Sequence, residues 1–346
     1  MIKTLELVNF RNHERLKLNF NKPFVYIYGE NGTGKTSILE AIHYLSTTKS
    51  FRTSEDKELV KLGEPFSKIS LRNEINAFEV VLSKTGKRVF VDNLEKRKIS
   101  EYIGGFNAVV FALEDLELVK GTPSDRRQFM DLEFSRIDKE YLGLLNEYKK
   151  ILKQRNSLLK KIHVSEDLTM LNILGESLYE VGIKIIKKRA EYLSDLNKRL
   201  IDVYKEFSDH KIELKYLPNV SESEFYDWVT KKQEIDIMYQ TTSAGIHKDD
   251  FILKLNGNDS RGYGSNGEQR LIVISLKMAL LSKIQEIKNK EIVLLLDDVL
   301  SELDGLKQEL ILSKIPRDNM IIITSASPCK IAENIEIIML KNGMGE

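Results

Sequence analysis

Apolar and polar residues alternate along the first part of the chain, which is the pattern of β-strands with one buried face. The alternation covers residues 2–8, 14–28 and 66–93, and residues 24–28 form an apolar run typical of a buried strand. A glycine-rich loop follows this run, and the apolar spacing over residues 36–45 then predicts a helix. The N-terminal part is therefore predicted to combine strands with at least one helix.

The spacing of apolar residues changes from about residue 133 onward. Apolar side chains step by three and four positions along residues 145–162, 171–185 and 193–207. This spacing predicts amphipathic helices with coiled-coil-like periodicity.

Strand patterns return after about residue 240. Residues 251–255 are predicted to form a strand and residues 271–281 a helix. The unbroken apolar runs at residues 292–296 and 320–324 are typical of buried parallel strands.

The order of these patterns predicts an α/β domain interrupted by a helical insert. Its halves are residues 1–125 and 236–346, and residues 126–235 form a helical arm. A chain of 346 residues is long enough for this arrangement, because about 150 residues make one domain.

Composition and charge narrow the classes of protein that the chain can represent. The 53 basic residues against 52 acidic ones leave a net charge of +1, which excludes a polycationic surface over the whole molecule. A nucleic-acid surface is therefore predicted only as a local basic patch. Cys329 is the single cysteine, which excludes an intrachain disulfide and fits a reducing compartment.

The polar residues near the N-terminus do not fit a signal peptide. No stretch of 18 apolar residues is present, so no transmembrane helix is expected. We expect a cytoplasmic protein with no membrane partner.

A phosphate-binding loop is the first candidate site. The segment fits G-x-x-x-x-G-K-[ST], between a predicted strand and a predicted helix, as this loop requires. Backbone N–H groups would surround the phosphates of ATP, the lysine would reach the β- and γ-phosphates, and the last hydroxyl would bind Mg²⁺. Its residues are Gly29, Glu30, Asn31, Gly32, Thr33, Gly34, Lys35 and Thr36.

Two carboxylates after the strand at residues 292–296 resemble the Walker B element. Asp297 would hold Mg²⁺, and Asp298 stands where ABC-type ATPases usually carry the glutamate that orients the attacking water. Because aspartate is one methylene shorter, slower hydrolysis is expected. The alternative is that both carboxylates only cap a strand-to-helix turn.

The segment at residues 265–270 resembles the ABC signature, S-G-G-Q in its common form, with Asn266 and Glu268 as departures. In that superfamily the signature caps the γ-phosphate of ATP held by a second subunit, which implies an ATP-dependent homodimer. The alternative is an ordinary capped helix. The residues predicted to act in trans are Ser265, Gly267 and Gln269.

Residues after the aspartate pair resemble the D-loop of the same superfamily, through Ser301 and Asp304. Two other markers of the superfamily differ. Thr324 and Ser325 replace the switch histidine, and Glu114 or Asp115 stands in place of the Q-loop glutamine.

Together these segments resemble the RecF family of bacterial recombination-mediator ATPases in the SMC/ABC group. The resemblance spans nearly the whole chain, and the combination of residues 120–127 with residues 245–250 is its most specific part. The matching segment at residues 7–12 contains Arg11, which is added to the predicted ATP-binding residues. The other matching segments are residues 7–12, 29–36, 48–53, 111–131, 295–298 and 302–304.

The resemblance implies an ABC-type P-loop ATPase head with an inserted, short coiled-coil-like arm. It further implies a weak DNA-dependent ATPase that dimerises with ATP on single-strand/double-strand junctions or gaps. Such proteins act with RecO and RecR to load RecA.

Basic residues on the predicted arm are candidates for DNA contacts, because their clusters could bind phosphates without reading bases. The alternative is a solvated helix face. Arg155 and Arg189 stand within these clusters, and His247 is interpreted either as a phosphate sensor or as a packing residue. The candidate DNA contacts are Arg52, Lys149, Lys150, Lys153, Lys187 and Lys188.

Two other classes of function stay open at this point. One is the ATP-hydrolysing subunit of a membrane transporter, and the other is an ATP-binding interaction scaffold with little turnover. A turnover assay with gapped DNA would separate the scaffold from an active ATPase.

Overall fold

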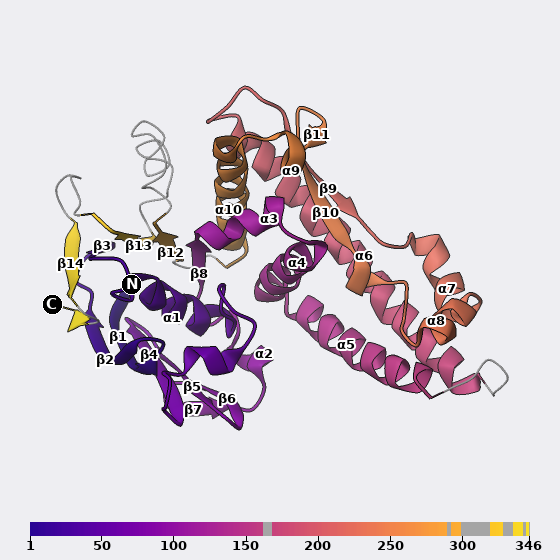
Figure 1. Ribbon diagram of the computed structural model, residues 1–346, viewed down its shortest axis with the longest axis horizontal. Coiled ribbons are helices and arrows are strands. Elements are labelled where there is room, and N and C mark those ends of the chain that lie inside the picture. The colour runs from indigo at the N-terminus through magenta and orange to yellow at the C-terminus, as the bar shows by residue number, and fades with distance from the viewer. Residues whose placement is uncertain (162–167, 289–291, 299–318, 328–334, 342–343, 346) are drawn as a thin grey trace. The chain divides into compact units, whose positions relative to one another are not determined.

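The computed structural model describes residues 1–161, 168–288, 292–298, 319–327, 335–341 and 344–345. The chain forms two compact units (Figure 1). Unit 1 contains Met1–Asp115 and the described part of Ile284–Glu346, and unit 2 contains Leu116–Lys283.

One sheet of unit 1 is an antiparallel sheet in the order β2-β1-β4-β5-β6-β7. Its strands alternate buried and less buried residues, as their sequence pattern predicts. The strands are β1 (Ile2–Phe10), β2 (His13–Asn19), β4 (Phe66–Asn73), β5 (Ala77–Ser83), β6 (Gly86–Val91) and β7 (Leu94–Lys96).

The other sheet of unit 1 has the order β15-β14-β3-β13-β12-β8, and all its pairs are parallel except β14 with β15. Parallel pairing brings the carboxyl ends of β3, β13 and β12 to one edge, where ligands bind in open α/β sheets. The strands are β3 (Phe24–Tyr28), β8 (Ala108–Phe111), β12 (Val293–Asp297), β13 (Met320–Ser325), β14 (Glu336–Lys341) and β15 (Met344–Gly345).

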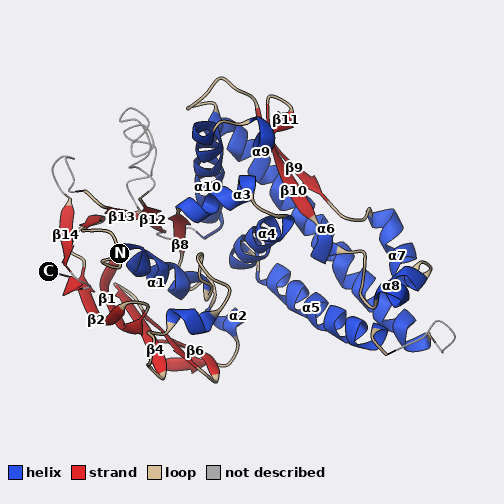
Figure 2. Cartoon of the chain, in the orientation of Figure 1, coloured by secondary structure: helices blue, strands red, loops and turns tan. Residues whose placement is uncertain are grey.

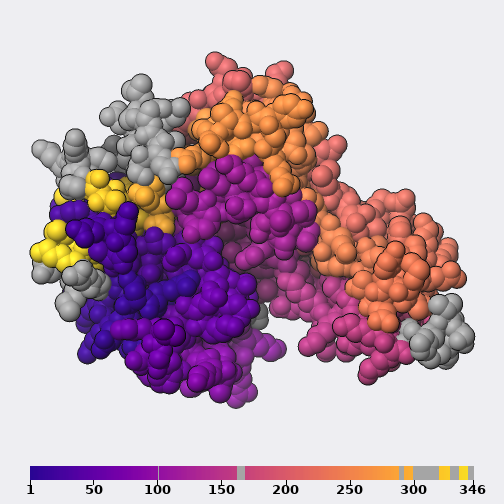
Figure 3. Space-filling view, in the orientation of Figure 1, coloured from indigo at the N-terminus to yellow at the C-terminus, as the bar shows by residue number. Residues whose placement is uncertain are grey.

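Helix α1 (Lys35–Thr47) contacts both sheets, and nearly all of its residues are buried. Its buried residues include apolar side chains such as Ile38 and Leu39 and polar ones such as Glu40, unlike a surface helix with one apolar stripe. The same hydrophobic core joins residues of α1 with residues of both sheets. In Figure 3 the yellow C-terminal segments lie against indigo N-terminal ones, in agreement with the pairing of β14 with β3. Short helical turns complete the described part of unit 1: η1 (Asp56–Leu59), α2 (Ile99–Tyr102) and, at its boundary, η2 (Leu113–Leu116).

Unit 2 is mostly helical, with a small three-stranded antiparallel sheet in the order β11-β10-β9 (Figure 2). The two apolar series predicted over 171–185 and 193–207 lie in one helix of 36 residues, α6, except that the helix ends at Tyr204; α6 packs along α5. The helices are α3 (Glu117–Lys120), α4 (Pro123–Ile137), α5 (Lys139–Leu159), α6 (Thr169–Tyr204), α7 (Glu222–Thr230), α8 (Gln233–Tyr239), η3 (Ile246–Lys248), α9 (Ser260–Tyr263) and α10 (Asn266–Lys288). The strands are β9 (Ile212–Leu217), β10 (Asp250–Leu255) and β11 (Asn258–Asp259).

The compact units do not coincide with the predicted boundaries at 125/126 and 235/236. Residues 236–283, predicted as part of the head, fold with the helices of unit 2, because β10 pairs with β9 and packs on α4. The division falls within α10, whose residues from Ile284 onward belong to unit 1. The three-part functional division stays a prediction.

Among the helices in the described ranges, none is both long enough and apolar enough to cross a membrane.

Candidate nucleotide-binding site

The predicted phosphate loop connects β3 to α1, and this strand–loop–helix order is confirmed. Gly34 has a φ of +95°, and a Cβ there would lie 2.3 Å from His13 Nε2. Gly32 has a φ of +86° with open space around it. Glycine is therefore required at position 34 by both backbone conformation and close packing, and at position 32 by conformation alone.

Lys35 lies at the start of α1 with its side chain turned back onto the loop. Its Nζ donates hydrogen bonds to the carbonyl oxygens of Gly29, at 2.7 Å, and Glu30, at 2.8 Å. Burial lowers the pKa of Lys35, and the carboxylates of Asp298 and Asp297 oppose this shift. The ammonium group thus lies in the loop that would hold the phosphates.

Asp297 meets the phosphate loop through hydrogen bonds from two threonines. Its Oδ1 accepts from Thr36 Oγ1 at 3.0 Å and from Thr324 Oγ1 at 2.7 Å. Thr324 is directly opposite Asp297 in the parallel register of β12 and β13. Burial raises the pKa of Asp297, and the hydrogen bonds from Thr324 and Thr36 oppose this shift.

Thr36 and Asp297 supply the donors that Mg²⁺ prefers, a hydroxyl and a carboxylate oxygen. Within the described ranges, no group of three or more His, Cys, Asp or Glu side chains forms a metal cage. Magnesium at nucleotide sites needs only one or two carboxylates in addition to substrate phosphates, so this pair fits it.

Asp298 follows β12 with a φ of 54°, and its backbone N–H donates to the Thr324 carbonyl at 3.2 Å. It lines a cavity of about 920 Å³ in unit 1 together with Lys35, Thr36 and Asp297. This volume is within the range of small-molecule and cofactor sites. The sequence-predicted lysine, threonine and aspartates therefore converge on one cavity.

The turn between β1 and β2 is fastened to the phosphate loop. Asn12 Nδ2 donates to the Gly32 carbonyl at 3.2 Å, and His13 Nε2 lies 3.2 Å from the Gly34 carbonyl oxygen. The turn places Arg11 in the wall of the cavity. The matching segment at residues 7–12 contains both Arg11 and Asn12, but only Arg11 was predicted as a site residue. His13, which follows this segment directly, was not predicted.

Arg52 also lines the cavity, although it was predicted as a DNA contact. It lies 3.5 Å from Glu40 and 3.7 Å from Glu114, measured between guanidinium nitrogens and carboxylate oxygens. Burial is the main cause that raises the pKa of Glu114, and nearby Asp297 adds to the shift. The placement of Arg52 therefore favours a nucleotide-site role over the predicted DNA contact.

The start of α10 in unit 2 carries the signature-like residues. Ser265 accepts a bond from the Glu268 backbone N–H, and its own N–H and hydroxyl donate to the Glu268 carboxylate at 2.8 and 2.7 Å. This is a reciprocal helix cap. Gly267 is exposed with open space around it, whereas Lys120 Nζ donates to Asn266 Oδ1 at 2.8 Å.

The contacts of Gln269 do not fit the predicted role in trans. Its side chain is buried, and its Nε2 donates to the carbonyl oxygens of Ser260 and Arg261 at 2.9 and 3.2 Å. It therefore fastens the preceding loop to its own helix. The predicted D-loop residues Ser301 and Asp304 lie outside the described residues.

The RecF/RecN/SMC N-terminal domain family matches residues 1–344. The DNA replication and repair protein RecF of Acholeplasma laidlawii is 47% identical over 99% of this chain and 98% of its own length. The chain belongs to the RecF family.

Other comparisons agree with this membership. RecF of Bacillus subtilis is 38% identical, over 94% of this chain and 93% of its own. A solved structure of the recombination mediator protein RecF with ATP, in the RecFOR pathway, has a TM-score of 0.93 and 34% identity over 100% of this chain and 96% of its own. An SMC head bound to the C-terminal winged-helix domain of ScpA, at 15% identity and a TM-score of 0.53, shares the fold.

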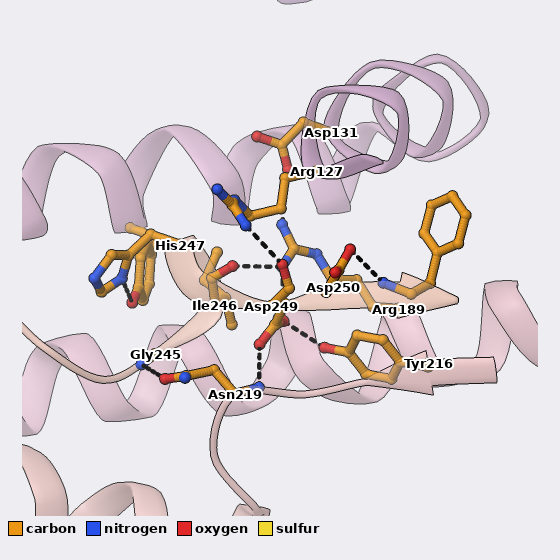
Figure 4. A network of polar contacts seen from close by, with 12 residues as sticks. Arg127, Asp131, Arg189, Tyr216, Asn219, Gly245, Ile246, His247, Asp249 and Asp250 are labelled. Carbon is orange, nitrogen blue, oxygen red and sulfur yellow. Dashed lines mark hydrogen bonds and ion pairs between the residues drawn. The ribbon is translucent and has the colours of Figure 1, made fainter. Parts of the chain in front are cut away.

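Two arginines of the predicted basic clusters are buried in this RecF-family chain. Arg155 is 0% exposed and donates to Asp236 Oδ2 at 2.6 Å. Arg189 is 1% exposed and donates to Asp249 at 2.7 Å and Asp131 at 2.8 Å (Figure 4). These two arginines therefore hold unit 2 together and are not available to DNA.

The predicted lysine contacts of the arm divide into two groups. Lys149 pairs with Asp131 at 2.8 Å, Lys188 with Asp138 and Glu140, and Lys187 with Glu222. The other two, Lys150 and Lys153, lie on α5 and are exposed, as Lys149 and Lys187 are.

His247 packs within unit 2. Its Nδ1 lies 2.9 Å from the Tyr148 hydroxyl, and its Nε2 lies 3.0 Å from the Thr242 carbonyl oxygen. Burial lowers the pKa of His247, which favours the neutral ring. These contacts favour the packing interpretation over the phosphate sensor.

Proposed function

We propose that this RecF-family chain is an ATP-dependent DNA-binding switch of recombinational repair. The observation that carries the proposal is the convergence of Lys35, Thr36 and Asp297 in one cavity at the edge of a parallel sheet. The family membership supports it, because the relatives are DNA replication and repair proteins and one was solved with ATP.

The chemistry proposed for the site follows from its residues. The N–H groups of the loop and the ammonium group of Lys35 bind the phosphates of ATP. Thr36 and Asp297 hold Mg²⁺, which would neutralise charge on the β- and γ-phosphates. Asp298 orients the attacking water, and its short side chain makes hydrolysis slow.

The switch itself is proposed to act through dimerisation. ATP joins two copies, with Ser265 and Gly267 of one copy against the nucleotide of the other, and the dimer holds DNA at a gap or junction until hydrolysis releases it. RecO and RecR are the proposed partners in loading RecA, and the relative solved with ATP belongs to the RecFOR pathway. A scaffold with little turnover is the second candidate, because an aspartate replaces the usual glutamate at position 298.

The test compares the wild type with Asp298→Asn in ATP turnover and in binding of gapped duplex DNA. We expect the wild type to hydrolyse ATP slowly and to bind DNA more tightly with ATP than with ADP. The variant should bind ATP normally, lose turnover and accumulate the dimer. Unchanged turnover in the variant would remove Asp298 from the mechanism, and DNA affinity that ignores ATP would contradict the switch.

The DNA surface is tested separately by replacing both Lys150 and Lys153 with alanine. If these lysines contact phosphates, the salt dependence of DNA affinity should become shallower by about one charge per lost contact. An identical salt slope in the double variant would remove them from the DNA surface. Lys231→Ala is the matched control, because Lys231 is an exposed lysine of the same unit that pairs with Asp227 and is not among the candidate DNA contacts.

A further inference from the structure

We propose that Glu40 is a positioning residue of the nucleotide site, whose carboxylate fixes the guanidinium groups of Arg11 and Arg52 in the cavity wall. The inference rests on the proposed function, because it concerns the nucleotide phosphates in the same cavity. Neither periodicity nor any motif in the sequence indicates a role for Glu40.

The contact between Glu40 and Arg11 is bidentate. Glu40 lies on α1, five residues after Lys35, and is 0% exposed. Its Oε1 accepts from Arg11 Nη2 at 2.6 Å, and its Oε2 accepts from Arg11 Nε at 2.9 Å. Two parallel charge-assisted bonds fix both the place and the plane of a guanidinium group.

The same carboxylate organises the segment that carries Arg52. Glu40 Oε2 lies 3.5 Å from Arg52 Nη1, and Oε1 accepts from the Ser50 hydroxyl at 2.5 Å. The Ser50 oxygen in turn accepts from the backbone N–H groups of Arg52 and Thr53, at 2.9 and 3.1 Å. Glu40 therefore controls both the side chain of Arg52 and the backbone next to it.

Arg11 is held from its other side as well. Its backbone N–H donates to the Leu59 carbonyl at 2.8 Å, and its Nη1 donates to the Glu58 carbonyl at 3.0 Å. With the Asn12 bond to the phosphate loop, these contacts leave the guanidinium little freedom of orientation. The cavity wall thus presents a preorganised cation beside the loop.

Charge and burial support a role beyond packing. A buried carboxylate is costly unless it is paired, and apolar residues often stabilise such a place equally well. Here one carboxylate collects two arginines from separate segments, and both arginines line the cavity together with Lys35. Guanidinium groups held beside the Lys35 ammonium group suit the di- or triphosphate part of a nucleotide.

The experiment measures the Kd of ATP and ADP for the full chain with Glu40→Gln. We expect ATP binding about tenfold weaker, because one charge-assisted bidentate contact is lost. In a mutant cycle, adding Glu40→Gln to protein that already carries Arg11→Gln and Arg52→Gln should weaken binding less than twofold further, since Glu40 acts through these two arginines. If Glu40 acted by packing alone, the fold-loss in ATP affinity from Glu40→Gln would multiply with the fold-loss from the arginine substitutions.

The matched control is Glu95→Gln. Glu95 forms a bidentate pair with Arg88 at the same distances, 2.9 and 2.6 Å, but this pair is exposed between β6 and β7. ATP affinity should be unchanged there. Glu40→Gln protein that melts like the wild type and binds ATP equally well would overturn the proposal, as would multiplying effects in the cycle.

Glu40→Asp keeps the charge but shortens the side chain. It tests the positioning role if Glu40→Gln does not fold. We expect it to bind ATP several-fold more weakly at near wild-type stability, because the guanidinium groups move with the carboxylate. Wild-type ATP affinity in Glu40→Asp would overturn the positioning role. A failure of the proposed function would give a different result from a failure of the positioning role. In that case the wild type and Glu95→Gln would also fail to bind ATP.

Discussion

Thr324 donates a hydrogen bond of 2.7 Å to the same carboxylate oxygen of Asp297 that accepts from Thr36. The bond joins the carboxyl ends of two neighbouring parallel strands, β12 and β13. Thr324 is 1% exposed, so the hydroxyl is part of the interior of the site. We infer that it holds the Asp297 carboxylate in place for Mg²⁺.

Replacing Thr324 with valine tests this relationship. The variant keeps the shape of the side chain but removes the donor, so we expect Mg²⁺-dependent ATP affinity to fall about fivefold, the equivalent of one hydrogen bond. Thr324→Ser keeps the hydroxyl and should retain most of the affinity. Equal binding by the valine variant and the wild type would show that Thr324 does not support Asp297.

The raised pKa of Asp297 makes the free energy of unfolding of the nucleotide-free protein depend on pH. Burial raises its pKa in the folded state above the ordinary 3.8, so the folded state binds the proton more tightly than the unfolded state. The resulting stability is complete below the ordinary pKa and is lost as the pH rises through the raised pKa.

Asp297→Asn removes this dependence, because asparagine carries no charge to bury. We expect the variant to melt at a higher temperature than the wild type at pH 7, with a difference that shrinks as the pH falls toward 3.8. Thermal unfolding by circular dichroism over this range measures it. A constant difference at every pH would contradict the assignment of the effect to Asp297 ionisation.

Ser265→Arg tests the role of the α10 start in dimerisation. The side chain is exposed and caps its own helix through Glu268, so a bulky cation there should leave unit 1 able to bind ATP. ATP-dependent dimers should disappear, as measured by light scattering, while ATP affinity stays at the wild-type value. Normal ATP-dependent dimers in the variant would contradict the proposed role in trans.

The buried pair of Arg155 with Asp236 predicts a large effect on stability. Arg155→Met leaves the Asp236 carboxylate buried and without its cation, which typically costs about 3–5 kcal/mol. Urea unfolding should show this loss. The double variant with Asp236→Leu should recover part of it, and a single variant as stable as the wild type would show that the pair is not structural.

The sequence predicted the strands and helices around the phosphate loop well, because each depends on short-range patterns. The run at residues 24–28, the loop and the following helix are adjacent in the chain, so local spacing contains the information. The same holds for the strand at residues 292–296, whose continuous apolar character marks a strand buried on both faces.

The sequence alone gave a less accurate view of the charged residues. Arg155 on α5 and Arg189 on α6 each stand near lysines in the sequence, and local spacing does not distinguish a solvated arginine from a buried one. Their partners Asp236 and Asp249 lie 81 and 60 residues away along the chain. The compact unit that contains the helices also includes β10, which pairs with β9 and packs on α4, and local spacing does not indicate these long-range contacts.

What the sequence by itself determined about this protein is the set of local elements and the chemistry of the phosphate loop, since backbone conformation and helix or strand periodicity depend on near neighbours. The tertiary structure alone decided which side chains meet: Thr36 with Asp297 across 261 residues, and Glu40 with Arg11 across 29. These contacts arise because parallel strands bring their carboxyl ends to one edge and because a buried charge is stable only where packing supplies its partner.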